Sequence, residues 1–133
     1  MLFIDTGAFI AKFLPADQFH IKATEIWKQL DKKQSKIVTS NFVLDETLTL
    51  LARRSSYEFA AEIAQALYSS EATKIVRPTL ETELSALTFF EKFSDQKISF
   101  TDCISFVVMA NVRIETALTF DRHFVQAGFR RLP

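Results

Sequence analysis

The segment from Ser99 to Phe124 most constrains what this chain can fold into. Its middle, Cys103 to Ala110, is apolar at all but one position, and a helix that is apolar on nearly every side is a buried helix. Asp102 directly precedes this run, and Asp121 directly follows a second apolar run, Thr116 to Phe120. Because an unpaired carboxylate is costly to bury, two acids beside the most buried segment indicate a bound cation.

Short apolar strands alternate with longer helices along the whole chain. The pattern predicts strands at 2–4, 37–39, 74–76 and 116–120, an edge strand at 129–132, and helices at 8–14, 19–33, 42–54, 57–68, 81–93, 102–113 and 121–126. Strands joined by helical crossovers pair in parallel, with helices on both faces of the sheet. We therefore predict the α/β class, a three-layer α/β/α sandwich with a parallel sheet of four to five strands, and a single domain over 1–133.

Two predicted helices carry an apolar stripe that we expect to face the core. Apolar residues three or four positions apart lie on one side of a helix. The stripes are Ile21, Ile26, Trp27 and Leu30 in helix 19–33, and Leu84, Leu87 and Phe90 in helix 81–93.

The composition restricts the function classes. Apolar residues make up 48% of the chain, with 14 Phe, which favours a well-filled core over disorder. The net charge is zero, so no overall basic character indicates nucleic-acid binding. A single Cys and two His are a poor zinc set. The single Cys cannot form an internal disulfide, which fits a reducing compartment. Without an apolar run of membrane-spanning length, we expect a soluble, cytoplasmic protein with no membrane partner.

Three acids occupy positions where strand ends and helix starts converge. Asp5 follows the first predicted strand and Asp121 the fourth, and the carboxyl ends of parallel strands form the edge where ligands bind. Asp102 begins the buried helix. Each of the three can also be interpreted as a helix cap, because carboxylates stabilise helix N-termini. Taken singly, both interpretations stay open.

Glu46 lies in predicted helix 42–54, next to Asp45. Its neighbours one turn away are Phe42, Val43 and Leu50, and a carboxylate among apolar side chains is an informative exception. We expect Glu46 to face inward and Asp45 to face solvent. A second apolar stripe on this helix leaves its orientation open.

Together, the four acids indicate a metal site. Two like charges 4 Å apart repel by about 4 kcal/mol near a protein surface, so a cluster of carboxylates needs a counter-ion. An all-oxygen set suits Mg²⁺ or Mn²⁺, and such sites support phosphate-ester chemistry. We expect Cys103 to be a buried small side chain, whereas His123 is either a substrate contact or a simple exposed residue.

Four segments resemble the PIN domain, particularly the small VapC-type toxins: LFIDTGAFIAKF, NFVLDETLTLL, SFTDCISFVVM and ALTFDRHFVQAGF. The resemblance spans the chain and implies a metal-dependent ribonuclease, often homodimeric, with an antitoxin partner in the toxin members. It also implies that the catalytic and metal-binding acids are Asp5, Glu46, Asp102 and Asp121, with the hydroxyls of Thr6 and Thr119 beside them.

Other functions stay open or are disfavoured. The resemblance also covers DNA-directed or RNA-processing PIN nucleases, and a catalytically silent PIN-fold module that binds proteins. A haloacid-dehalogenase-like phosphatase would carry a second Asp two residues after Asp5, but position 7 is Gly. A P-loop or Rossmann nucleotide binder needs several glycines near one turn, and this chain has two in total.

Overall fold

The computed structural model describes the whole chain, Met1 to Pro133, and contains one sheet of five strands. The strands are β1 (Leu2–Ile4), β2 (Ile37–Ser40), β3 (Thr73–Val76), β4 (Thr116–Leu118) and β5 (Arg130–Leu132), in the order β3-β2-β1-β4-β5. Every neighbouring pair is parallel. The predicted parallel sheet, including its C-terminal edge strand, is confirmed.

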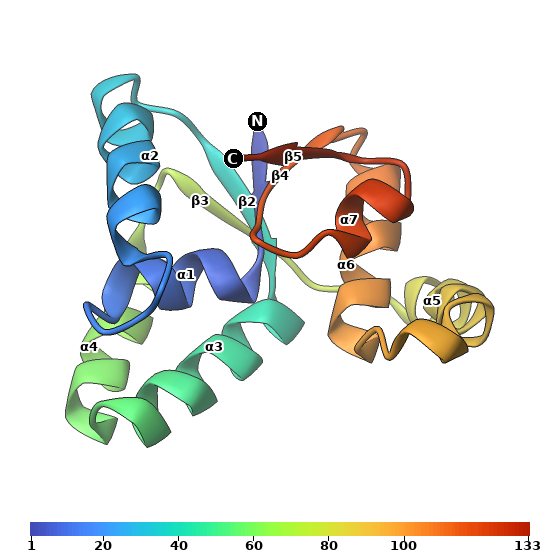
Figure 1. The fold of residues 1–133 in the computed structure, drawn as a ribbon, viewed down its shortest axis with the longest axis horizontal. Helices are drawn as coiled ribbons and strands as arrows, with labels where there is room; N and C mark the ends of the chain where they lie inside the picture. The colour runs from blue at the N-terminus through green and yellow to red at the C-terminus, as the bar shows by residue number, and fades with distance from the viewer.

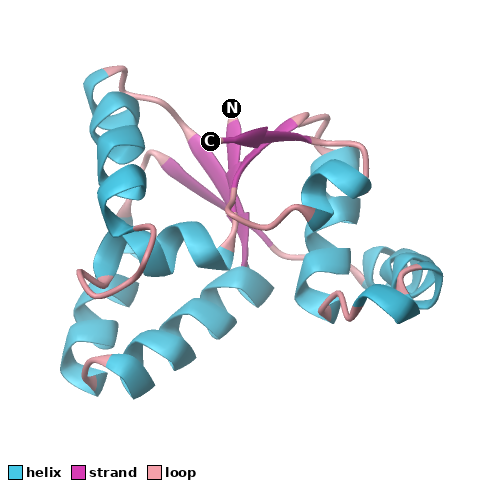
Figure 2. Ribbon diagram, in the orientation of Figure 1, coloured by secondary structure: helices cyan, strands magenta, loops and turns pink.

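Helices lie on both sides of this sheet (Figures 1 and 2). In the view of Figure 1, α1, α2 and α4 lie to the left of the sheet, α3 lies below it, and α5 to α7 lie to its right. Their bounds are α1 Thr6–Phe13, α2 His20–Lys32, α3 Asn41–Arg54, α4 Tyr57–Ser69, α5 Leu80–Lys92, α6 Phe100–Asn111 and α7 His123–Gln126. The three-layer α/β/α arrangement is therefore confirmed. No helix has both the length and the apolar character needed to cross a membrane.

Helix α6 forms the centre of the core, as its sequence predicts. Residues 103–109 are all buried, and Phe106 is fully enclosed. The Phe106 ring makes edge-on contacts with Phe89, Phe93 and Phe124, with centroids 5.8, 6.4 and 5.0 Å away. Such aromatic pairs add stability beyond the apolar area that they bury. The α6 helix therefore joins α5 and α7 into one layer.

The expected orientation of helix 81–93 is wrong. In α5, Thr82 and Ala86 are buried, whereas Leu84, Leu87 and Phe90 are 56%, 44% and 45% exposed. This helix has two apolar stripes, and it packs on α6 through the stripe that contains the small Ala86, together with Phe89 and Phe93. The other stripe stays on the surface. In α2, Ile26 and Trp27 are buried as expected, but Ile21 is 78% exposed.

The chain between β4 and α7 is less regular than the sequence predicts. Strand β4 ends at Leu118, and α7 begins at His123 instead of at Asp121. The Asp121 carboxylate accepts a hydrogen bond from the backbone N–H of His123 at 2.8 Å, a local bond that favours a turn over a helix. Asp121 therefore lies in the loop and not in α7.

Candidate active site

Asp5 is held rigidly where β1 ends and α1 begins. Its Oδ1 accepts a hydrogen bond from the backbone N–H of Thr6 at 2.8 Å, and its Oδ2 accepts one from the hydroxyl of Thr119 at 2.8 Å. The residue is only 5% exposed. Asp5 therefore caps α1 and also presents its carboxylate at the carboxyl edge of the sheet, so both sequence interpretations describe it.

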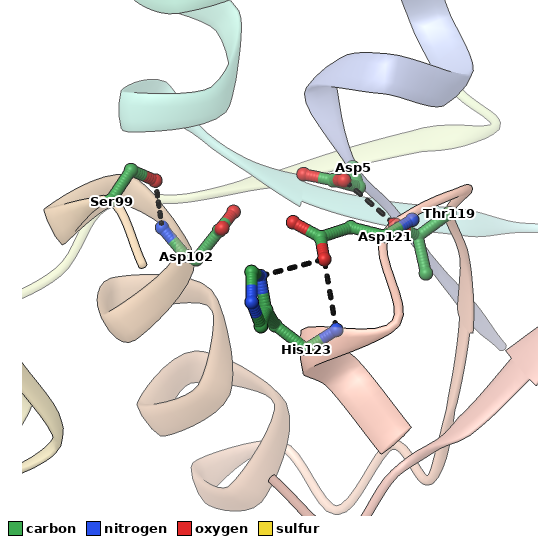
Figure 3. Close-up of polar contacts among 6 residues, drawn as sticks. All are labelled: Asp5, Ser99, Asp102, Thr119, Asp121 and His123. Carbon is green, nitrogen blue, oxygen red and sulfur yellow. Dashed lines mark hydrogen bonds and ion pairs between the residues drawn. The ribbon is translucent and has the colours of Figure 1, made fainter. Parts of the chain in front are cut away.

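Thr119 connects Asp5 with Asp121. Its hydroxyl oxygen accepts a hydrogen bond from the backbone N–H of Asp121 at 3.0 Å while it donates to Asp5. Nδ1 of His123 lies 2.8 Å from Oδ1 of Asp121, so the two side chains form a charge pair whenever the imidazole is protonated. Figure 3 shows the contacts of Thr119 with Asp5 and of His123 with Asp121.

Asp102 belongs to the first turn of α6 but does not cap it. Ser99 is the N-cap, and its hydroxyl accepts a hydrogen bond from the backbone N–H of Asp102 at 3.1 Å. The cap therefore fixes the backbone of Asp102, and the carboxylate points into the space shared with Asp5 and Asp121 (Figure 3). Ser99 therefore supplies the cap that the sequence also allowed Asp102 to supply.

Glu46 reaches the same space from α3. It is half-buried and lines the cavity described below, whereas its neighbour Asp45 is exposed. The expected orientation of the two acids is therefore confirmed. Ser40 begins α3 by accepting a hydrogen bond from the backbone N–H of Val43 at 3.2 Å, which places the helix at the end of β2.

A single open cavity of about 690 Å³ contains all four predicted acids. It lies at the carboxyl edge of the sheet, where α/β proteins bind ligands. Besides the acids, it is lined by His123 and by residues to which the sequence assigned no role: Arg54, Arg122, Arg131, Gln18, Phe19 and Phe120. The arginines add positive charge around an otherwise acidic centre.

The carboxylates in this cavity repel one another. Burial and then the charges of Asp5, Asp121 and Glu46 raise the pKa of Asp102 to about 8. Burial also raises the pKa of Asp5 to about 6, although the hydrogen bonds from Thr119 and Thr6 lower it. Carboxyl groups that hold their protons near neutral pH are typical of functional sites. The protein alone therefore does not balance the charge of this cluster.

The donor set fits a hard divalent cation. One ligand atom each from Asp102, Asp121 and His123 lie within 4.8 Å of one another. The hydroxyl of Thr6 lines the cavity and is buried without a hydrogen-bond partner, so a polar group is missing from its surroundings. Carboxylate and water oxygens are the ligands that Mg²⁺ prefers. Asp5 and Glu46 belong to the same cavity but lie outside this closest group.

The sequence left His123 open as a substrate contact or a simple exposed residue, and the structure shows it half-buried against Asp121. The sequence shows only that it follows Asp121 by two positions. That spacing is typical of a turn in which an Asp side chain binds the backbone two residues on, and this turn brings the imidazole back to the carboxylate. An Asp-x-His pair directly after a buried strand was therefore the available signal.

The fold and the site define the class of protein. A parallel α/β sandwich with a cluster of acids at the carboxyl edge of its sheet is what the sequence resemblance led us to expect. The sequence profile of the PIN domain matches residues 2–130. The chain belongs to the PIN-domain family.

Within that family, the similar proteins are VapC-type ribonucleases. The 23S rRNA-specific endonuclease VapC20 of Mycobacterium tuberculosis is 35% identical over 129 residues, covering 97% of this chain and 95% of that protein. The VapC ribonuclease of Archaeoglobus fulgidus is 28% identical over 123 residues, covering 91% of this chain and 77% of that protein.

Solved structures show the same fold. The crystal structure of VapC20, described as a sarcin-ricin loop cleaving toxin, superposes with a TM-score of 0.87 at 32% identity, covering 97% of this chain and 96% of that one. The DNA-bound VapBC structure from Salmonella typhimurium gives a TM-score of 0.69 at 14% identity, covering 99% of this chain and 98% of that one. The second similarity concerns the fold alone.

Proposed function

We propose that this protein is a Mg²⁺- or Mn²⁺-dependent endoribonuclease that hydrolyses RNA phosphodiester bonds. The observation that carries the proposal is the meeting of Asp5, Glu46, Asp102 and Asp121 in one open cavity. The mutual repulsion of these acids favours a cation. The cavity is open, and the arginines that line it are exposed, so an RNA strand can reach it.

The four acids have two kinds of role in this proposal. Asp5, Asp102 and Asp121 would hold the cation, and Glu46 would either join them or accept the proton of the attacking water. A divalent cation held there supplies positive charge to the phosphate oxygens and acidifies coordinated water. In hydrolysis, water forms a new bond to phosphorus, the bond to the leaving sugar oxygen breaks, and that oxygen takes up a proton. Thr119 positions Asp5 and Asp121 for these roles through its two hydrogen bonds.

The relatives narrow the biological role. Because VapC20 is named a 23S rRNA-specific endonuclease, 23S rRNA is the first substrate to test. Activity on this RNA would place the protein in the cytoplasm. We also propose that the protein is the toxin of a type II toxin–antitoxin pair and binds a cognate antitoxin. Its similarity to VapC-type proteins over nearly the whole chain supports this role.

The exposed apolar side of α5 supports the proposal that the protein forms a homodimer. Leu80, Leu84, Leu87 and Phe90 follow one side of this helix, and each is at least 44% exposed. Contiguous exposed apolar surface marks interaction sites, and a helix stripe can pair with its own copy about a two-fold axis. We therefore assign this stripe to contact with a second copy of the chain.

Cleavage of RNA by the purified protein tests the function. Wild-type protein should cleave 23S rRNA or single-stranded RNA when Mg²⁺ or Mn²⁺ is added, and EDTA should stop cleavage. Asp102→Asn should fold but lose activity by about 10²-fold or more, because the cation is the main source of charge stabilisation in the transition state. Asp45→Asn, which changes the exposed neighbour of Glu46, is the matched control and should remain active.

Three outcomes would contradict the proposal. Wild-type activity in folded Asp102→Asn would exclude the metal-binding role of this acid. Cleavage of single-stranded DNA of the same sequence, with RNA left intact, would identify a DNA-directed enzyme. A folded wild-type protein that cleaves neither nucleic acid would favour a silent binding module.

A further inference from the structure

Two phenylalanines stack at the edge of the acidic cavity. The rings of Phe19 and Phe120 are parallel within 2°, with centroids 4.4 Å apart, and both residues line the cavity. Phe120 comes directly before Asp121 and packs against the core. Phe19 covers Phe120 on the outside and is 38% exposed. The pair therefore places an aromatic surface beside the carboxylates.

Helix capping does not explain an aromatic residue at position 19. Phe19 is the N-cap residue of α2, where its side chain makes no capping hydrogen bond, and polar residues are strongly preferred at such positions. Asp17 compensates by accepting a hydrogen bond from the backbone N–H of Phe19 at 2.9 Å. The chain thus keeps an exposed ring where Ser or Asp would suit the helix better.

The surface around Phe19 continues beyond the acids. A second hollow, of about 630 Å³, shares Asp17, Gln18 and Arg54 with the acidic cavity. Arg54 therefore borders both hollows, and Phe19 directly follows two of the shared residues. An RNA chain with one phosphate among the acids could therefore also contact the Arg54 guanidinium and the Phe19 ring.

The geometry points to a base-binding subsite in which Phe19, backed by Phe120, stacks with an unpaired nucleobase of the RNA next to the cleaved phosphate. The inference rests on the proposed function for the class of its ligand. Stacking on an aromatic face is worth about 1–3 kcal/mol per base and tolerates any base, and unpaired bases are those that RNA-binding proteins recognise in this way. Phe19 is a positioning residue for the substrate and does not touch the reacting atoms.

Binding can be measured separately from cleavage. Short single-stranded RNAs with 2-aminopurine at one position at a time are titrated with the Asp102→Asn variant in Mg²⁺. Quenching of the 2-aminopurine fluorescence should be strongest at one position and should be lost when Phe19→Leu is added. Phe19→Trp should restore it. Tyr68→Leu, which changes an exposed ring on α4 that does not line the cavity, should leave the quenching unchanged.

Kinetics on the otherwise wild-type protein provide the second measurement. Phe19→Leu should raise KM about tenfold with little change in kcat, because one stacking contact is lost. A substrate that is abasic at the quenched position should give wild type and Phe19→Leu the same KM. Circular dichroism and thermal unfolding show whether each variant is folded.

The outcomes separate this inference from the proposed function. Equal quenching and equal KM in wild type and folded Phe19→Leu would overturn the base-binding subsite, even if cleavage is normal. Quenching that depends on Phe19 without any cleavage by wild type would keep the subsite and contradict the nuclease. Loss of binding to a co-purifying protein in Phe19→Leu, with RNA binding unchanged, would assign the ring to a protein contact and overturn the inference.

Discussion

The hydroxyl of Thr119 donates a hydrogen bond to Oδ2 of Asp5 at 2.8 Å, although the two residues are 114 positions apart in the chain. The same hydroxyl accepts the backbone N–H of Asp121. A single buried oxygen therefore fixes two of the four acids and joins the ends of the adjacent strands β1 and β4. The integrity of the site depends on a residue that carries no charge.

Thr119→Val should damage the site as well as the fold. The valine keeps the shape of the threonine but removes both hydrogen bonds, so the free energy of unfolding should fall by about 1–3 kcal/mol. The pKa of Asp5 should rise further, because the Thr119 bond lowers it. RNA cleavage should fall by about tenfold or more, because Asp121 loses its anchor. Chemical denaturation and cleavage assays measure the two effects.

Thr39→Val is the matched control for this substitution. Thr39 is equally buried, and its hydroxyl donates to the backbone carbonyl of Ile4 at 3.0 Å, with no contact to an acid. The free energy of unfolding of Thr39→Val should fall by a similar amount, but the folded variant should keep its RNA-cleaving activity. Equal activities for Thr119→Val and Thr39→Val would show that Thr119 has no positioning role.

The stability of the metal-free protein should decrease as the pH rises. Folding raises the pKa of Asp5 to about 6 and that of Asp102 to about 8, from an ordinary value of 3.8. The folded state therefore binds these protons more tightly than the unfolded state. The resulting stabilisation is complete below about pH 3.8 and is lost as the pH rises through about 6 and about 8.

Thermal unfolding in EDTA at a series of pH values tests this expectation. The midpoint should fall from about pH 5 to about pH 9 in the wild type. It should fall less in Asp102→Asn, because this variant lacks the carboxyl with the higher pKa. A wild-type midpoint that is constant or rises over this range would show that the acids do not destabilise the metal-free fold.

Added Mg²⁺ or Mn²⁺ should stabilise the protein. A cation that binds only the folded state raises stability by mass action, by about 2.7 kcal/mol at a concentration one hundred times its Kd. The thermal midpoint should therefore rise in the wild type and in Asp45→Asn, and rise much less in Asp5→Asn. The increase should be larger at high pH, where fewer protons compete for the carboxylates. Equal midpoints with saturating metal and with EDTA would argue against the site.

The four acids and the sheet could be predicted from the sequence because both follow from simple rules. Short apolar strands between helices have few parallel arrangements available. An acid placed directly after such a strand, as Asp5 is, then falls at the carboxyl edge whatever the details of packing. Glu46 is favoured as the inward acid because Phe42, Val43 and Leu50 lie one turn away from it, although a second apolar stripe leaves the orientation of the helix open.

Other features depend on contacts that periodicity does not contain. Helix α5 has two apolar stripes, and the buried one is the stripe whose Phe89 ring meets Phe106 of α6. The contact between His123 and Asp121 depends on a turn that Thr119 stabilises. The stacking of Phe19 on Phe120 joins a loop to a distant strand end. Each of these requires a tertiary neighbour that the local sequence does not identify.

The two glycines should respond in opposite ways to Ala. Gly128 has a φ of +96°, which L-residues rarely adopt, so Gly128→Ala should destabilise the protein by about 1 kcal/mol. Gly7 is in α1, where a Cβ would meet only Oδ2 of Asp5 at 4.0 Å. Gly7→Ala should therefore be neutral or stabilising by up to about 1 kcal/mol. If chemical denaturation showed that both variants lose the same free energy of unfolding, this conformational explanation would be contradicted.

Replacing Leu84 on the exposed stripe of α5 should separate the proposed dimer. Leu84→Glu places a charge where a second copy would bury an apolar side chain, and burying an unpaired charge is costly. Sedimentation should show a dimer for the wild type and a monomer for Leu84→Glu. Ile21→Glu is the control, because Ile21 is also exposed but lies on α2. A wild type that is monomeric at high micromolar concentration would remove the dimer from the proposal.

The strand order has a consequence for synthesis on the ribosome. Strand β1 lies between β2 and β4, and a chain made from its N-terminus presents β2 early and β4 late. Until β4 has emerged, one edge of β1 has no partner, and Asp5 lacks the hydroxyl of Thr119 and the company of Asp121. A partly translated chain therefore lacks part of its acidic site. The complete acidic site forms only when the last strands of the sheet have left the ribosome.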